Sequence, residues 1–160
     1  ANASLNNLAA SVTRPLDLSL GKRTGRPLLV LFEQGNCAEC DDLHRQMLSH
    51  PEVAYALTNI DVAQIDIHTD EPLTTPDGRA LSSRAWMQEL DIQYAPSLVF
   101  FDTGGEEVFR TEAYLRRFHI HGAIDYVVSG ASPAQPSFQR FLQHRTEVLA
   151  ARGIEIDLMQ

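Results

Sequence analysis

The sequence has only two cysteines among its 160 residues, so no disulfide framework can hold the fold and a hydrophobic core must do so. It also has no apolar run that approaches the roughly 20 residues a helix needs to cross a bilayer. Basic residues are outnumbered, with 13 Lys and Arg against 21 Asp and Glu, and they are scattered. We therefore expect no membrane span and no nucleic-acid partner.

The composition is otherwise that of an ordinary globular domain. Hydrophobic residues make up 44% of the chain, charged residues 21%, and the net charge is −8. The length suits one domain with a real core. We expect an arm over residues 1–15, a folded domain over 16–152 and a tail over 153–160. The first residue is Ala1, which suits a processed secretory product or a trimmed chain.

The first clear element is the short apolar run LLVLF at residues 28–32. Its length and its lack of polar residues predict a strand that is buried on both faces. A helical period starts a few residues later and predicts an amphipathic helix. The predicted buried face of that helix consists of Cys40, Leu43, Met47 and Leu48.

Further strands are predicted over residues 62–68 and 96–102. A Gly-Gly turn and the alternating segment EEVFRTE follow the second of these and predict an antiparallel partner. The polar stretch TDEPLTTPDGRA at residues 69–80 contains two prolines and an Asp-Gly turn, so we predict a surface loop. The order of strands and helices indicates an α/β protein with a mixed sheet.

Three more helices complete the prediction. Ser82 or Ser83 is a suitable cap for RAWMQEL, in which Trp86 is expected to be a core aromatic. The last helix is expected from Phe138 to about residue 151. Between them, the segment LRRFHIHGAIDYVV predicts a helix whose inward stripe is Ile120, Ile124, Val127 and Val128.

The two cysteines form the motif Cys37-Ala38-Glu39-Cys40 at the predicted start of the first long helix. A helix N-terminus has unpaired N–H groups and partial positive charge, which stabilise a thiolate. The first cysteine then serves as nucleophile, and the second, one turn later, resolves the mixed disulfide. A zinc site and an inert structural disulfide remain alternatives. Zinc needs two more ligands, and a disulfide across so short a loop constrains the unfolded chain little.

The resemblance to a known family extends beyond this motif. The strand LLVLFEQ, the CAEC segment and YAPSLVFFDTGGEEVFR together resemble the thioredoxin superfamily over about residues 16–152. The resemblance implies a thioredoxin-like fold, with a central mixed β-sheet flanked by helices and here an extra C-terminal helix. It also implies a cis peptide bond between Ala95 and Pro96, which would face the cysteine pair and bind an extended substrate strand.

Within that superfamily the chain is similar to the SoxW-like periplasmic thioredoxins, which are associated with sulfur-oxidation operons, and more distantly to the C-terminal domain of DsbD. The segments that carry this similarity are FEQGNCAEC, HPEV, TPDG and the tail AYL…F…IDYVVSG…SFQRFL. The similarity implies an exported, monomeric thiol–disulfide oxidoreductase of the bacterial periplasm. It would reduce protein disulfides, take electrons from a membrane donor of the DsbD or CcdA type, and use neither an organic cofactor nor a metal.

Two departures from the usual thioredoxin pattern concern the tuning of the thiols. Leu31 stands where thioredoxins have a buried aspartate that moves protons at the second cysteine. Glu33 could replace this acid, or its side chain could point to solvent. Glu39 lies between the cysteines and, with the acidic residues that follow Cys40, opposes a strongly stabilised thiolate. We therefore expect a reductase, with an oxidase or isomerase, or a redox-sensing binding module without turnover, as the alternatives.

Overall fold

In a computed structural model of the protein, the residues described are 4–8, 10–111 and 117–129. The predicted helix from Phe138, which is the extra C-terminal helix, and the predicted tail over 153–160 lie outside the described residues. No helix in the described ranges is long and apolar enough to cross a membrane.

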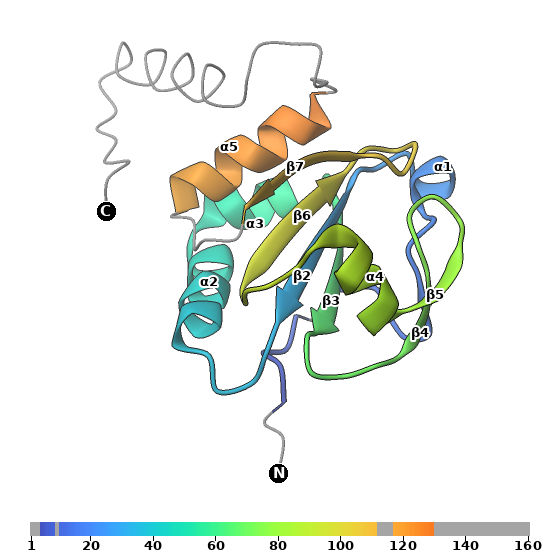
Figure 1. The fold of residues 1–160 in the computed structure, drawn as a ribbon. Helices are drawn as coiled ribbons and strands as arrows, with labels where there is room; N and C mark the ends of the chain where they lie inside the picture. Colours follow the sequence, from blue (N-terminus) through green and yellow to red (C-terminus); the bar gives the residue numbers. More distant parts are fainter. Residues whose placement is uncertain (1–3, 9, 112–116, 130–160) are drawn as a thin grey trace.

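The main sheet has four strands in the order β3-β2-β6-β7 (Figure 1). They are β2 (Leu28–Glu33), β3 (Asp61–Asp66), β6 (Ser97–Phe101) and β7 (Glu107–Thr111). β2 runs parallel to β3 and antiparallel to β6, and β6 runs antiparallel to β7. All six residues of the central strand β2 are buried, which confirms the prediction from its unbroken apolar run.

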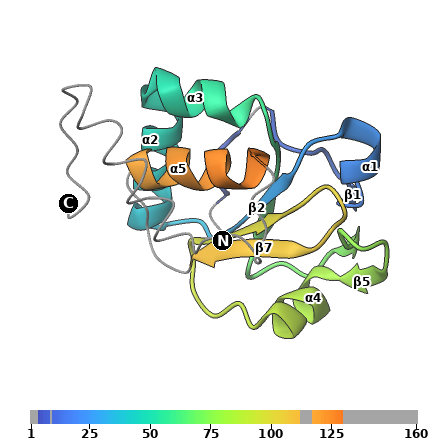
Figure 2. The same cartoon turned by 90° about the horizontal axis from the view of Figure 1, so that it is seen from above.

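Helices cover both faces of this sheet (Figure 2). On one face lie α2 (Ala38–Ser49), α3 (Pro51–Leu57) and α5 (Arg117–Val128), and on the other lies α4 (Ser83–Leu90). Ser82 caps α4 as expected, since its side chain accepts a hydrogen bond from the amide of Ala85. The predicted α/β architecture with a mixed sheet between helices is confirmed.

The core is divided between the two faces by the alternation of β2. Leu29 and Leu31 pack with the cluster that includes α2, α3 and α5, whereas Val30 and Phe32 pack with the cluster around α4. Since side chains alternate along a strand, Glu33 follows Leu31 onto the α2 face. The carboxylate of Glu33 therefore lies on the same face of the sheet as Leu31, toward α2.

Trp86 anchors α4 against the sheet, as the sequence predicted. Its side chain is only 2% exposed, and its ring centroid lies 5.7 Å from those of Phe32 and Phe101. Large aromatic side chains contribute much of the energy of a core. Trp86 therefore packs α4 against the sheet, together with the buried Met87.

The predicted surface loop over residues 69–80 is wrong in part. β4 (Pro72–Thr74) and β5 (Ala80–Ser82) form an antiparallel hairpin, and β4 also pairs in parallel with β1 (Leu16–Asp17). A short helix, α1 (Gly21–Thr24), follows β1. Leu73 is buried against the α4 side of the core, which explains why this polar segment is ordered as a second, three-stranded sheet.

An ionic clasp joins the turn of this hairpin to α4. Arg79 donates to both carboxylate oxygens of Glu89 and to Asp77, which also accepts a hydrogen bond from the Thr75 hydroxyl. The Thr75 hydroxyl, followed by Arg79, holds the pKa of Asp77 below its usual value, and Arg79 does the same for the pKa of Glu89. These carboxylates are exposed, so the clasp fixes geometry more than it adds stability.

Two predicted helix faces need correction. Leu48 is 62% exposed and Val128 is 41% exposed, although both were expected to point inward. In α2 the fourth buried position belongs instead to His44, which lies beside Cys40, Leu43 and Met47. A polar residue thus replaces an apolar one on the face of α2 that packs on the sheet.

The N-terminal arm packs along the outer edge of β3. Leu8 is buried in the core cluster of the α2 face, and the amide of Val12 donates to the carbonyl of Val62 at 2.8 Å. Arg14 donates to the carbonyl of Gln64 at 2.9 Å and pairs with Glu71. The arm therefore covers a sheet edge that would otherwise expose backbone groups.

Candidate active site

The cysteine pair lies between the end of β2 and the first turn of α2. Asn36 has a left-handed backbone, with φ of 51°, and this turn brings the chain from β2 to Cys37. Cys37 is the N-cap of α2, and its Sγ accepts a hydrogen bond from the amide of Cys40 at 3.1 Å. Cys37 and Cys40 form a disulfide, with their Cα atoms 5.2 Å apart.

The two cysteines differ in burial. Cys37 is 7% exposed and Cys40 is fully buried. Since Cys37 sits at the positive end of the helix and Cys40 sits on its inner face, the arrangement suits a nucleophile at the first position and a resolving thiol at the second.

Glu33 is buried rather than directed to solvent. It is 1% exposed, and its Oε1 lies 2.5 Å from Nε2 of His44, which is 3% exposed. Its other oxygen, Oε2, accepts a hydrogen bond of 2.8 Å from the Gln64 side chain on β3. The sequence did not assign a role to His44 or Gln64, although His44 lies four residues after Cys40 and hence on the same helix face.

The acidic residues around the pair are not equivalent. Glu39 is exposed between the cysteines. Asp41 accepts a hydrogen bond of 2.8 Å from Asn6 of the arm, and Asp42 forms an ion pair with Arg45 one turn along α2. Glu39 and Asp41 are thus exposed, whereas Glu33 is buried against His44.

The segment before β6 meets the cysteine loop at one edge of the sheet. The Ala95–Pro96 peptide bond is cis, Pro96 is buried and Ala95 is half-buried. In the antiparallel register Phe32 is opposite Ser97, so Pro96 lies beside the end of β2 from which the chain continues to Cys37. Tyr94, two residues before Pro96, is 59% exposed to solvent.

Comparison with known proteins assigns the chain to a family and a fold. The chain matches the Thioredoxin-like domain family over residues 15–127. The protein belongs to the thioredoxin-like family. Among curated proteins, no sequence matches the chain significantly.

Solved structures show the same fold. A thioredoxin-fold protein from Helicobacter pylori has a TM-score of 0.67 at 12% identity, covering 77% of this chain and 86% of its own. A thioredoxin from Thermus thermophilus has a TM-score of 0.53 at 23% identity, covering 69% and 79%. A mutant thioredoxin from Halobacterium salinarum NRC-1 has a TM-score of 0.50 at 20% identity, covering 76% and 96%. In this thioredoxin-like protein, a disulfide-forming Cys-x-x-Cys pair on that fold suggests thiol–disulfide exchange.

The difference in burial predicts which thiol reacts first. In the reduced protein, a limiting amount of an alkylating reagent should label Cys37, because it lies at the helix start while Cys40 is covered. Peptide mapping by mass spectrometry measures the ratio, and a Cys37→Ser variant is the control that should stay unlabelled under the same conditions. Preferential labelling of Cys40 would reverse the assignment of roles.

Proposed function

We propose that the protein is a thiol–disulfide oxidoreductase that reduces disulfides of other proteins. The observation that carries this proposal is the Cys37–Cys40 disulfide at the N-terminus of α2, with the cis Ala95–Pro96 segment at the same edge of the sheet. Ala95 and Pro96 would bind an extended substrate strand there. The resemblance to SoxW-like proteins supports a site of action in the bacterial periplasm, as a monomer, and a link to sulfur oxidation.

The reaction needs only the two cysteines and a proton acceptor. The Cys37 thiolate attacks one sulfur of the substrate disulfide, and the other sulfur leaves as a thiolate. Cys40 then loses its proton and attacks Cys37, which releases the second substrate thiolate and leaves the Cys37–Cys40 disulfide. We assign the proton acceptor for Cys40 to Glu33, whose buried carboxylate lies on the α2 face of the sheet. A membrane donor of the DsbD or CcdA type would return two electrons to the pair.

The charges near Cys37 favour the reducing direction. A strongly oxidising pair requires a thiolate that is stabilised far beyond the disulfide. Here Glu39 is exposed between the cysteines and opposes the positive end of α2. The ion pair between Asp42 and Arg45 offsets part of the negative charge near Cys37, but the charge of Glu39 remains.

A redox titration tests this direction. We predict a midpoint potential of about −270 mV, close to thioredoxin, rather than about −120 mV, which is typical of a strong oxidant. Removing the charge in Glu39→Gln should stabilise the thiolate and move the potential to a less negative value, whereas Glu106→Gln in the remote β6–β7 turn should not. Equilibration with dithiothreitol or glutathione measures the potentials. A wild-type value at the oxidising end would favour the oxidase or isomerase instead.

A further inference from the structure

A buried carboxylate–imidazole pair lies next to the cysteines. Glu33 and His44 are together almost fully buried, and Gln64 completes the set by donating to the second Glu33 oxygen. Burying such a pair is costly, and apolar residues of similar size usually give equal or better stability. Stability alone therefore does not account for a glutamate and a histidine in the core at this position.

The helix places this pair beside the resolving thiol. Cys40 and His44 are four residues apart on α2, so their side chains are neighbours on the face toward the sheet. Glu33 is the last residue of β2 and reaches the same face from the sheet. The pair thus lies one helical turn from Cys40, in a region closed to solvent on the sheet side.

We propose that His44 is a positioning residue for the proton transfer that activates Cys40. This inference rests on the proposed reductase chemistry, in which Glu33 accepts that proton. The Nε2–H group of His44 donates to Oε1 of Glu33, which stabilises the ionised carboxylate and fixes its orientation. The remaining lone pairs of the carboxylate are then available to receive a proton.

The step balances in protons and charge. The S–H bond of Cys40 breaks, its proton moves to the Glu33 carboxylate, and the electron pair forms the bond to Sγ of Cys37. The bond between Cys37 and the substrate sulfur breaks, and that sulfur leaves as a thiolate. The Glu33–His44 pair passes from one negative charge to none, so the negative charge leaves with the substrate and no charge remains uncompensated in the core.

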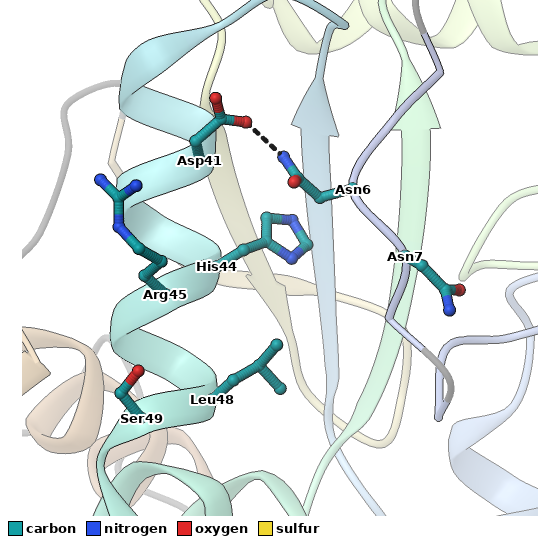
Figure 3. Close-up of a pocket in the computed structure, with 7 residues that line it drawn as sticks. All are labelled: Asn6, Asn7, Asp41, His44, Arg45, Leu48 and Ser49. Atoms are coloured by element: carbon teal, nitrogen blue, oxygen red, sulfur yellow. Dashed lines mark hydrogen bonds between the residues drawn. The ribbon is translucent and has the colours of Figure 1, made fainter.

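The second ring nitrogen of His44, Nδ1, is not used in the pairing with Glu33. Since Nε2 donates to Glu33, Nδ1 carries a lone pair, and it has no hydrogen-bond partner within the described ranges. The ring lines a depression between α2 and the N-terminal arm, where Asn6 and Asn7 form the opposite wall (Figure 3). A proton bound at Nδ1 would make the pair neutral and weaken Glu33 as an acceptor.

Within the described ranges, the charged groups around the Glu33–His44 pair come from β2, α2 and β3. Those near the ring are Glu33 from β2 and, at the rim of the depression, Asp41 and Arg45 from α2. From β3, Asp66 is the register partner of Glu33 and places a further carboxylate beside it, and Gln64 donates to the backbone carbonyl of Asn6 as well as to Glu33.

Two-phase kinetics with an aromatic disulfide separate the two cysteines. Reduced protein releases one aromatic thiol when Cys37 attacks and a second when Cys40 resolves the mixed disulfide. We expect His44→Asn to slow the second phase roughly tenfold or more and Glu33→Gln to slow it roughly 100-fold, with the first phase unchanged in both. The pH profile of the second phase should also differ between the wild type and His44→Asn, a difference that a purely structural role for His44 would not cause.

The control is His68→Asn. His68 also uses its Nε2 in a hydrogen bond, to Gln34 at 2.7 Å, but it is exposed and should affect neither phase. A second variant, the double substitution Glu33→Met and His44→Leu, separates the proposed positioning role of His44 from a role in packing, because an apolar pair should preserve folding. It should unfold like the wild type and resolve as slowly as Glu33→Gln alone, since the two residues act as one unit.

The outcomes separate this inference from the proposed function. A His44→Asn protein that resolves at the wild-type rate across the pH range would overturn the role of His44 and leave the oxidoreductase proposal standing. The same holds if the double apolar variant resolves normally. A wild-type protein that never releases the second thiol would instead overturn the oxidoreductase proposal itself.

Discussion

A Cys40→Ser variant is expected to accumulate as a mixed disulfide with its substrate. Cys37 can still attack, but the serine hydroxyl cannot displace the bound sulfur, so the reaction stops after its first step. Multiple turnover should therefore be lost, and non-reducing electrophoresis followed by mass spectrometry should find the partner joined to Cys37. Because Cys40 is fully buried, it cannot replace Cys37 as the attacking thiol.

The matched variant is Cys37→Ser, which should lose turnover without trapping any partner. Both variants remove one thiol and both leave α2 intact, so a difference between them reports the order of attack. Equal trapping by the two variants would show that either sulfur can attack. Catalytic turnover by Cys40→Ser would contradict the assignment of Cys40 as the resolving thiol.

Replacing Trp86 by alanine should produce the largest loss of stability among single substitutions in the α4 region. The ring is 2% exposed between Phe32 and Phe101, so its removal leaves a large cavity between α4 and the sheet. Substitutions of this kind cost about 3–5 kcal/mol in the free energy of unfolding. Since Trp86 is the only tryptophan, urea unfolding should be followed by circular dichroism rather than by fluorescence.

Tyr55→Ala is the control for this measurement. Tyr55 is an aromatic residue on α3 that is 75% exposed, and surface substitutions of this type usually change stability by no more than about 0.5 kcal/mol. If both variants lost the same stability, the packing role assigned to Trp86 would be wrong.

The sequence predicted the order of the main elements because hydrophobic periodicity reports burial directly. The run at residues 28–32 became the central strand, and the alternation after Gly104-Gly105 became β7. The N-cap of α4 could also be predicted, since Ser82 stands immediately before an amphipathic segment. These signals are local, and local signals are the ones that a single sequence carries best.

The partners of Glu33 could not be predicted in this way. Periodicity placed Leu48 on the buried face of α2 because it counts apolar residues, whereas the structure buries His44 there, with its Nε2 paired to Glu33. That pairing joins residues from a strand and a helix, and Gln64 adds a second strand. One signal was available: a glutamate at the end of a strand that is buried on both faces needs a partner whichever way it points.

The small sheet escaped prediction for a related reason. β4 and β5 have three residues each, and Pro72 and Pro76 with Asp77-Gly78 indicate a loop. Their order depends on pairing with β1, more than 50 residues earlier in the chain, and on the burial of Leu73. No pattern within residues 69–80 encodes that contact.

Catalytic reduction of insulin disulfides, with dithiothreitol as the electron source, tests the central claim most directly. The account predicts that wild-type protein accelerates the reaction in proportion to its concentration, and that Cys37→Ser returns it to the rate with dithiothreitol alone. A wild-type rate no higher than that background, from protein whose Cys37–Cys40 disulfide is shown to be reduced under the assay conditions, would contradict catalysis and favour a redox-sensing binding module.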